Sequence, residues 1–132
     1  MNIYGLGLDM VNSNRIKDII KKNKKFEKKI FSKEEISFCE NKKNKFSCLA
    51  KRFAAKEAVM KALGTGVRGV GWKDIEIKRE RGGPPYIELH GRAQTRASKM
   101  DLSDISISLS HSNDFAIATV VGEATAGNRL PR

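Results

Sequence analysis

The segment 4–11, YGLGLDMV, alternates strictly and constrains the fold more than any other part of the chain. Alternation with a period of two predicts a β-strand whose two faces differ. One face has Tyr4, Leu6, Leu8 and Met10, and the other has Gly5, Gly7, Asp9 and Val11. Because glycine has no side chain, another element can approach the strand backbone closely beneath Asp9. Tight packing alone would also explain the glycines, so the pattern leaves the role of Asp9 open.

The remaining patterns predict an α+β fold in a single domain, residues 1–121. They predict a helix capped by Asn12 or Ser13, a short helix that begins at the capping box SKEE, a long helix over residues 46–63 that Gly64 ends, and a helix over residues 91–99. Strands are expected within residues 72–78, 86–90, 105–109 and 115–121. Residues 24–30 are a basic stretch without a predicted element, and residues 122–132 are expected to form a frayed tail.

Charge and cysteine content narrow the class of protein. The net charge is +11, and residues 1–62 carry 16 Lys and Arg against 7 Asp and Glu, a net +9. Such a field attracts a nucleic acid, an anionic membrane, an acidic protein or a polyanionic cofactor. Cys39 and Cys48 have no recognisable spacing and are expected to be reduced thiols. With no leader and no apolar stretch of membrane-spanning length, we expect a soluble cytoplasmic domain that does not bind membranes.

A second carboxylate, Glu57, lies in the predicted long helix beside three cations. Glu57 and Lys61 are four residues apart and share a helix face, and Arg52 and Lys56 share a neighbouring face. Two carboxylates beside cations favour a site for Mg²⁺ and a phosphorylated ligand. Taken alone, a Glu–Lys pair at this spacing is more often a solvated surface pair. A lone histidine in a turn, such as His111, is likewise a weak signal.

Three segments occur in the order and spacing of one known family: IYGLGLDMV, FAAKEAVMKALGTG and ISISLSHSNDFAIATVV. With them the chain resembles the small bacterial phosphopantetheinyl transferases, the holo-acyl-carrier-protein synthase family. The resemblance implies transfer of 4′-phosphopantetheine from coenzyme A to a serine of apo-acyl carrier protein, for fatty acid biosynthesis, with release of adenosine 3′,5′-bisphosphate. It further implies a Mg²⁺ requirement, a ferredoxin-like fold with an antiparallel sheet packed on a long central helix, and a homotrimer with active sites between subunits.

The resemblance also implies roles for particular residues. Asp9 and Glu57 fall on metal-binding positions, and together with Lys61, which would contact the pyrophosphate, they form the expected catalytic group. The general base is left open between Glu57, acting through a metal-bound water, and Lys61. The positions expected to meet coenzyme A are Lys43, Arg52, Lys56, Lys61, Gly64, Thr65, Gly66, Gly82, His111 and Ser112. Those expected to dock the acidic carrier protein are Arg15, Lys21, Lys22 and Lys25.

Two departures from the family pattern accompany these assignments. Asn44 follows Lys43 where the family has a basic pair, and Gly82 stands where relatives often have a polar residue. Two other classes of function fit parts of the sequence. The positive charge would suit a nucleic-acid-binding protein. However, the basic residues are not interleaved with aromatic ones and no recognition motif is present, so we expect no nucleic-acid partner. A coenzyme-A-binding module without catalysis would lack Asp9 or Glu57.

Overall fold

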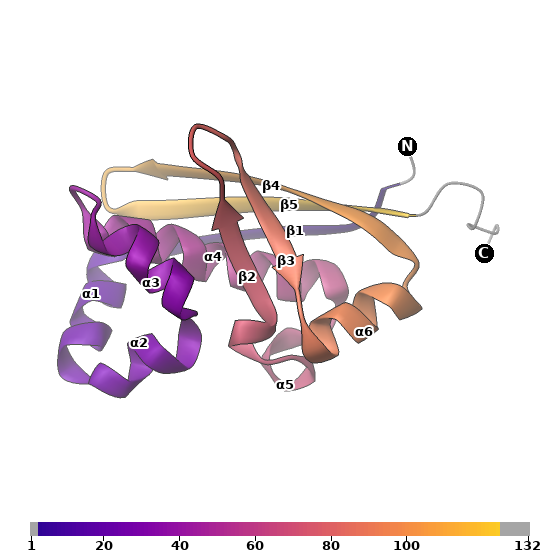
Figure 1. Ribbon diagram of the computed structural model, residues 1–132, viewed down its shortest axis with the longest axis horizontal. Coiled ribbons are helices and arrows are strands. Elements are labelled where there is room, and N and C mark those ends of the chain that lie inside the picture. The colour runs from indigo at the N-terminus through magenta and orange to yellow at the C-terminus, as the bar shows by residue number, and fades with distance from the viewer. Residues whose placement is uncertain (1–2, 125–132) are drawn as a thin grey trace.

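The computed structural model describes residues 3–124 of the chain (Figure 1). In chain order its elements are β1 (Ile3–Asn12), α1 (Ser13–Lys22), α2 (Lys24–Ile30), α3 (Lys33–Glu40), α4 (Lys45–Leu63), α5 (Gly66–Gly69), η1 (Trp72–Asp74), β2 (Ile75–Arg79), β3 (Pro85–Leu89), α6 (Gly91–Lys99), β4 (Leu102–Ser112) and β5 (Phe115–Ala124). This order confirms the expected α+β class. No helix among those described has the length and apolar character needed to cross a bilayer.

The strands form two separate antiparallel sheets. The larger has the strand order β1-β5-β4, and the smaller is the hairpin of β2 and β3. β4 and β5 are joined by a two-residue turn, since Ser112 pairs with Phe115 and Asn113 takes a positive φ of 53°. Asparagine tolerates this left-handed conformation better than most residues, which explains the turn. β5 continues to Ala124, three residues past the predicted strand, and the rest of the predicted tail lies outside the described residues.

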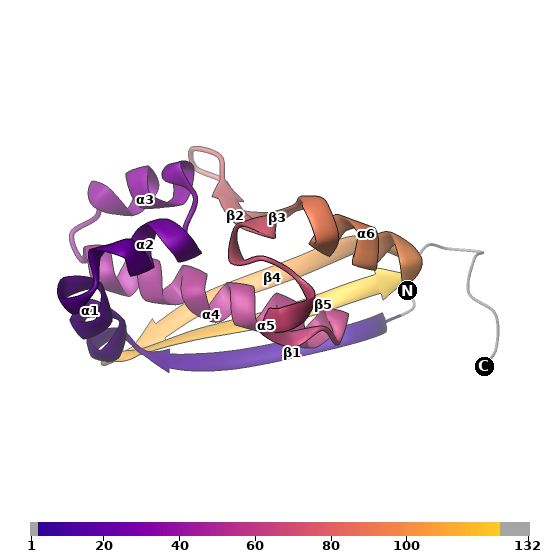
Figure 2. The same ribbon diagram turned by 90° about the horizontal axis from the view of Figure 1, so that it is seen from below.

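The long helix α4 packs along β1 and β5, on one face of the larger sheet (Figure 2). The glycine face of β1 explains how close this contact is. A Cβ atom on Gly5 would lie 2.6 Å from the carbonyl oxygen of Ala62, and one on Gly7 would overlap the carbonyl oxygen of Ala58. The predicted close approach to this strand face is therefore confirmed, and α4 is the element that makes it. Gly64 ends α4 with a φ of 70°, as predicted for a C-cap.

The three short helices α1, α2 and α3 cover one end of α4 (Figure 1). Asn12 caps α1, and Ser32 caps α3 with the predicted capping box to Glu35. The basic stretch without a predicted element is the helix α2, which the side chain of Asn23 caps. Its apolar residues Phe26 and Ile30 pack into the cluster around Phe31 and Leu49. Two apolar residues in seven gave too little periodicity to predict this helix.

A buried ion pair joins α3, α4 and β2. Lys56 Nζ lies 2.8 Å from Glu35 Oε1, and both side chains are fully buried. The ammonium also donates to the carbonyl oxygens of Trp72 at 3.0 Å and Ile75 at 2.6 Å. Its three hydrogens thus have three acceptors. Glu35 in turn accepts from the backbone N–H groups of Ser32 and Ile77, both at 2.8 Å.

The expectation of two reduced thiols is wrong for this structure, because Cys39 and Cys48 form a disulfide. Cys39 lies at the end of α3 and Cys48 in the first turn of α4, and the reversal of the chain between these helices brings their Cα atoms to 5.5 Å. That separation is within the range a disulfide requires. The sequence spacing of nine residues carries no signal for such a pair unless the two helix ends are known.

The outer face of the larger sheet exposes apolar side chains. Leu6, Leu8 and Met10 of β1 are each 60% exposed or more, and Phe115 of β5 is 42% exposed. In the β1–β5 register, Leu6 lies opposite Val121 and Met10 opposite Ile117, so the apolar residues form a continuous strip. Contiguous exposed apolar surface of this kind marks an interaction site.

Candidate active site

Asp9, Glu57 and Lys61 meet where β1 lies on α4, as predicted. Asp9 follows Gly7 on the strand face that contacts the helix, and its register partner on β5 is the small residue Ala118. Lys61 Nζ donates to Asp9 Oδ1 and to the carbonyl oxygen of Leu8, both at 2.9 Å. The Asp9 side chain is only 13% exposed, whereas that of Lys61 is 55% exposed. The lysine therefore lies at the solvent edge of this carboxylate pair.

The pKa of Glu57 is raised in this setting. Burial raises the pKa of Glu57 to about 7, and the charge of Asp9 and a hydrogen bond with Asp9 add to the rise. The cations Lys61 and Arg15 oppose it. The hydrogen bond to Asp9 raises the pKa of Lys61, so its ammonium stays charged at neutral pH. Two acids that share a proton in this way are close enough to share a cation instead.

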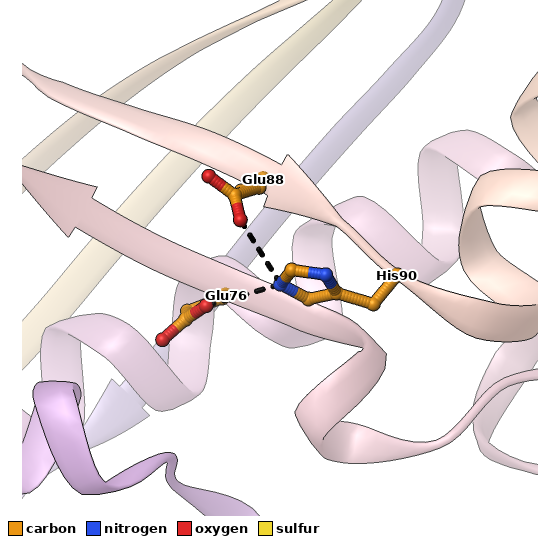
Figure 3. A group of neighbouring side chains, drawn as sticks. All are labelled: Glu76, Glu88 and His90. Atoms are coloured by element: carbon orange, nitrogen blue, oxygen red, sulfur yellow. Dashed lines mark hydrogen bonds and ion pairs between the residues drawn. The ribbon is translucent and has the colours of Figure 1, made fainter.

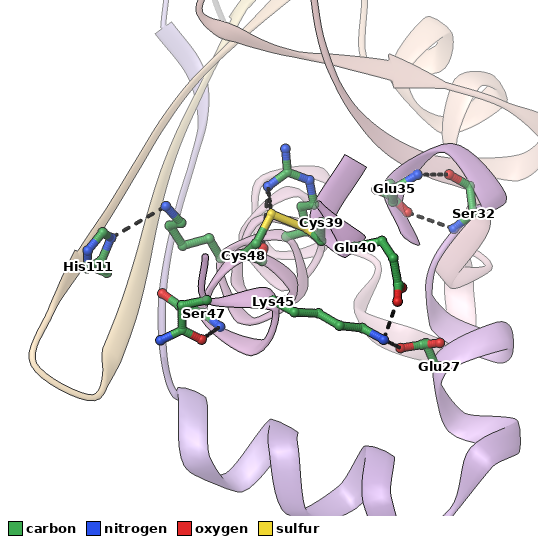
Figure 4. Close-up of a disulfide and its surroundings, with 12 residues drawn as sticks. Glu27, Ser32, Glu35, Cys39, Glu40, Lys45, Ser47, Cys48 and His111 are labelled. Atoms are coloured by element: carbon green, nitrogen blue, oxygen red, sulfur yellow. Dashed lines mark hydrogen bonds and ion pairs between the residues drawn. A yellow bond between two sulfur atoms is a disulfide. The ribbon is translucent and has the colours of Figure 1, made fainter. Parts of the chain in front are cut away.

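A basic pocket of about 650 Å³ opens beside the first half of α4. The basic residues that line it come from three elements and a loop: Lys42, Lys51, Arg52, Arg79 and His111. Its described lining includes no carboxylate. Lys51 Nζ lies 3.4 Å from His111 Nδ1 (Figure 4). Burial lowers the pKa of Lys51, and its cationic neighbours Arg52, Arg79 and Lys42 lower it further. Excess positive charge without a carboxylate partner suits an anionic ligand.

Arg52 forms the wall of this basic pocket on α4. It is 3% exposed, and burial lowers the pKa of its guanidinium to about 10. One nitrogen donates to Cys48 Sγ at 3.3 Å and to the Cys48 carbonyl oxygen at 3.4 Å, and the guanidinium carbon lies 4.3 Å from the centre of the Phe38 ring. Nε has no hydrogen-bond partner. Arg52 is thus a buried cation at the wall of the pocket, without a carboxylate partner among the described residues.

The other predicted coenzyme contacts are scattered. His111 lines the basic pocket with Arg52, whereas Ser112 and Lys43 are exposed and do not line it. Gly82 is an exposed turn residue two positions before Pro84, which does line it. Gly64, Thr65 and Gly66 lie at the far end of α4, about 18 Å from Arg52 along the helix at 1.5 Å per residue. One pocket of this chain does not gather all of them.

Lys56 is placed differently from what the resemblance implies. Its ammonium is buried and satisfied by Glu35 and two carbonyl oxygens, so no donor remains for a phosphate. Lys42, Lys51 and Arg79 were not among the predicted residues, although they line the basic pocket. Only their charge distinguishes them in the sequence, and α3, α4 and β2 bring them together only once the chain is folded.

The predicted carrier-docking residues are all exposed, on α1 and at the start of α2: Arg15, Lys21, Lys22 and Lys25. Arg15 is near enough to the carboxylate pair that its charge opposes the raised pKa of Glu57. An acidic partner bound to this group would therefore lie beside Asp9 and Glu57.

A second group of potential metal ligands lies on the smaller sheet (Figure 3). Glu76 and Glu88 are opposite each other in the β2–β3 register, and His90 Nε2 lies 3.0 Å from Glu76 and 3.5 Å from Glu88. Ser32 donates to Glu76 at 2.8 Å, and Lys78 lies 3.4 Å from Glu88. These contacts already offset the repulsion between two like charges in opposite positions. We therefore treat this group as the polar contact that joins β2, β3 and the start of α3.

Comparison with known proteins gives a consistent result. The family model of the 4′-phosphopantetheinyl transferase superfamily matches residues 5–120. The holo-[acyl-carrier-protein] synthase of Halothermothrix orenii is 43% identical over 122 residues, which are 92% of this chain and 98% of that protein. The crystal structure of the synthase of Neisseria meningitidis superposes with a TM-score of 0.83 at 36% identity, over 92% of this chain and 98% of that one.

The Helicobacter pylori synthase, solved in complex with coenzyme A, has a TM-score of 0.79 at 33% identity, over 89% of this chain and 99% of that one. These matches confirm the resemblance carried by the three sequence motifs and the α+β fold that it implied. With a family model that matches most of its length and relatives of this similarity, the chain belongs to the 4′-phosphopantetheinyl transferase superfamily.

Proposed function

We propose that this protein is a Mg²⁺-dependent transferase that moves 4′-phosphopantetheine from coenzyme A to a serine of apo-acyl carrier protein. The observation that carries the proposal is the position of the Asp9–Glu57 pair. The pair contacts Lys61 and lies near Arg15 on the exposed basic face of α1, and the same chain has a pocket lined by basic residues. Related proteins are named for this reaction, and one relative was solved with coenzyme A. In this proposal the carboxylate pair holds the metal, the basic pocket binds the phosphorylated donor, and the exposed basic residues of α1 and α2 meet the acidic acceptor.

The carboxylate pair fits a divalent cation. Mg²⁺ is usually held by one or two carboxylates, with phosphate oxygens and waters as its other ligands. Asp9 and Glu57 supply two carboxylates, and burial together with repulsion from the charge of Asp9 raises the pKa of Glu57 to about 7. A cation between them would remove that repulsion. Bound there, Mg²⁺ would supply positive charge to the pyrophosphate oxygens during phosphoryl transfer.

The side chains around the pair supply the rest of the chemistry. The Lys61 ammonium, held by Asp9 at 2.9 Å, is a cation that can contact the pyrophosphate at the solvent edge. Its raised pKa makes it a poor proton acceptor at neutral pH, so of the two candidate bases we favour Glu57. The carrier serine loses its proton to that carboxylate as its oxygen attacks the β-phosphorus. The bond from that phosphorus to the oxygen of adenosine 3′,5′-bisphosphate then breaks.

The two flanking surfaces hold the substrates. Arg52, with its unused Nε–H, and the Lys51–His111 pair would bind phosphate groups of the coenzyme in the basic pocket. Arg15 and the lysines of α1 and α2 would attract the acidic carrier protein. Such steering raises the association rate and is screened by salt. We also propose that the reaction takes place in the cytoplasm.

We further propose a homotrimer with shared active sites. The exposed apolar strip of Leu6, Leu8, Met10 and Phe115 needs a cover, and a second copy of the chain would provide one. The separation of Gly64 from Arg52 along α4 also favours a site that two subunits complete. Both observations support association, and the number of subunits comes from the family resemblance.

Mass spectrometry of apo-acyl carrier protein tests the function. The carrier is incubated with this protein and coenzyme A in Mg²⁺, and in parallel with EDTA. We expect the carrier to gain the mass of one phosphopantetheine group in Mg²⁺ alone. A folded protein that binds coenzyme A but leaves several apo-carriers unmodified in Mg²⁺ would overturn the proposal and favour a binding module.

A further inference from the structure

The Cys39–Cys48 disulfide forms part of the wall of the basic pocket. Cys48 lines the pocket beside Lys51 and Arg52, while Cys39 is completely buried behind it. Figure 4 shows the disulfide between the end of α3 and the first turn of α4, with His111 on the facing hairpin. The Cys48 sulfur is therefore the one that a small solute in the pocket would meet.

The disulfide sets the position of Arg52. The guanidinium donates to Cys48 Sγ at 3.3 Å and packs 4.3 Å over the ring of Phe38, one residue before Cys39. Both contacts thus come from residues at or next to the disulfide. Cys48 and Arg52 are four residues apart on α4, so the helix keeps that contact, whereas the Phe38 contact from α3 loses its fixed geometry if the two sulfurs separate. The pocket then loses part of the preorganisation of the Arg52 guanidinium.

The disulfide also closes the loop that lies between α3 and α4. Lys42 and Asn44 of this loop line the basic pocket, and Lys42 Nζ lies 4.4 Å over the Phe38 ring. Two other links lie near the loop: the Lys42 N–H bonds the Cys39 carbonyl at 3.1 Å, and an ion pair joins Lys45 and Glu40 at 3.2 Å. The buried Glu35–Lys56 pair also joins α3 to α4, but two helical turns further along α4. The disulfide is thus the covalent restraint on this wall of the pocket.

We propose that the Cys39–Cys48 pair is a reversible redox clamp on the basic pocket, with the disulfide form binding the phosphorylated ligand more tightly. The proposal rests on the proposed function, in which this pocket takes phosphates of coenzyme A. Disulfides inside mesophilic cells are usually transient and redox-sensing, which agrees with a disulfide whose Cys48 lines a pocket. Closure of the clamp lowers the ordering cost of binding.

The switching reaction needs only a low-molecular-weight thiol. Its thiolate attacks Cys48 Sγ, the protein S–S bond breaks, and the Cys39 sulfur leaves as a thiolate that takes a proton from water. A second thiolate attacks the external sulfur of the mixed disulfide, and Cys48 leaves as a thiolate that is protonated in turn. The protein gains two electrons and two protons, and two thiols become one external disulfide. The reverse reaction closes the clamp.

Calorimetric titration with adenosine 3′,5′-bisphosphate tests the proposal, because this probe keeps the 3′-phosphate and one of the two pyrophosphate phosphates of coenzyme A but has no thiol of its own. The full-length protein is measured in the disulfide form and after reduction, with the thiols of each sample counted by alkylation and mass. We expect reduction to weaken binding by about five- to twentyfold. The Cys39→Ala/Cys48→Ala variant should bind like the reduced protein whether or not reductant is present.

Linkage gives a second readout that needs no variant. If the disulfide favours the probe, the probe must favour the disulfide by the same factor. In a series of glutathione buffers, saturating probe should therefore shift the ratio of disulfide to dithiol by the fold-change that calorimetry measured. Equal or tighter binding by the reduced protein would overturn the clamp, as would thiols that stay free in oxidised glutathione. Absence of binding by both forms would instead overturn the proposed function of the pocket.

Discussion

Replacement of Lys56 by Met distinguishes a structural role for this residue from the phosphate contact that the family resemblance implies. The change leaves Glu35 fully buried without its counterion and leaves the carbonyl oxygens of Trp72 and Ile75 without a donor. Removal of one partner from a buried pair costs about 3–5 kcal/mol. We therefore expect Lys56→Met to lose that much unfolding free energy in urea, in the absence of ligand.

Two further variants make the result interpretable. In Glu35→Gln/Lys56→Met, the neutral amide needs no counterion, so we expect it to regain about 2 kcal/mol relative to Lys56→Met. Lys51→Met, on the wall of the basic pocket, is the matched control. It should weaken binding of adenosine 3′,5′-bisphosphate while changing the unfolding free energy by no more than about 0.5 kcal/mol. If Lys56→Met kept full stability and lost the bisphosphate, Lys56 would be a ligand-binding residue and our interpretation of the ion pair would be wrong.

Three other changes test the remaining contacts. Gly7→Ala should cost at least about 1–3 kcal/mol in urea unfolding, because its Cβ would overlap the Ala58 carbonyl; an unchanged midpoint would mean that β1 and α4 are not in close contact. Because the pKa of Glu57 is raised in the folded protein, the free energy of unfolding in EDTA should fall by about 1–2 kcal/mol, after allowance for solvent screening, as pH rises from about 4.5 to 7. Glu57→Gln should remove this pH dependence, and an equal dependence in the variant would refute the assignment. Leu8→Glu, on the exposed apolar strip, should lower the mass measured by light scattering to that of a monomer. Ser106→Glu, on β4 where the exposed residues are serines rather than apolar residues, should leave that mass unchanged.

The carboxylate pair was predictable because each part of it has a local signal. The glycines of β1 predict a close contact beside Asp9, and the helical spacing places Glu57 and Lys61 on one face of α4. The helix boundaries and the C-cap at Gly64 follow from the same kind of local pattern. Only one tertiary contact, that of β1 with α4, is then needed to form the pair, and the glycine face of β1 permits it.

The basic pocket was not predictable in the same way. Its cations come from α4, β2, β4 and a loop, and no sequence spacing connects Lys51 with Arg79 or His111. Lys56 shows a related difficulty. Spacing tells which residues share a face of α4, but Ala54, Ala55 and Ala58 are buried around that helix, so there is no polar side to mark which lysine is exposed. The disulfide was missed because two helix ends, rather than a motif, bring its cysteines together.

The measurement that tests the assignment of the reaction centre most directly is a crystal structure with Mn²⁺ and coenzyme A, with the metal located by its anomalous scattering. Mn²⁺ takes oxygen ligands as Mg²⁺ does. We predict one Mn²⁺ between Asp9 and Glu57, in contact with the pyrophosphate, and a phosphate of the coenzyme against Arg52 and His111. Mn²⁺ on Glu76, Glu88 and His90, with no metal at Asp9 when coenzyme A is bound, would contradict the assignment.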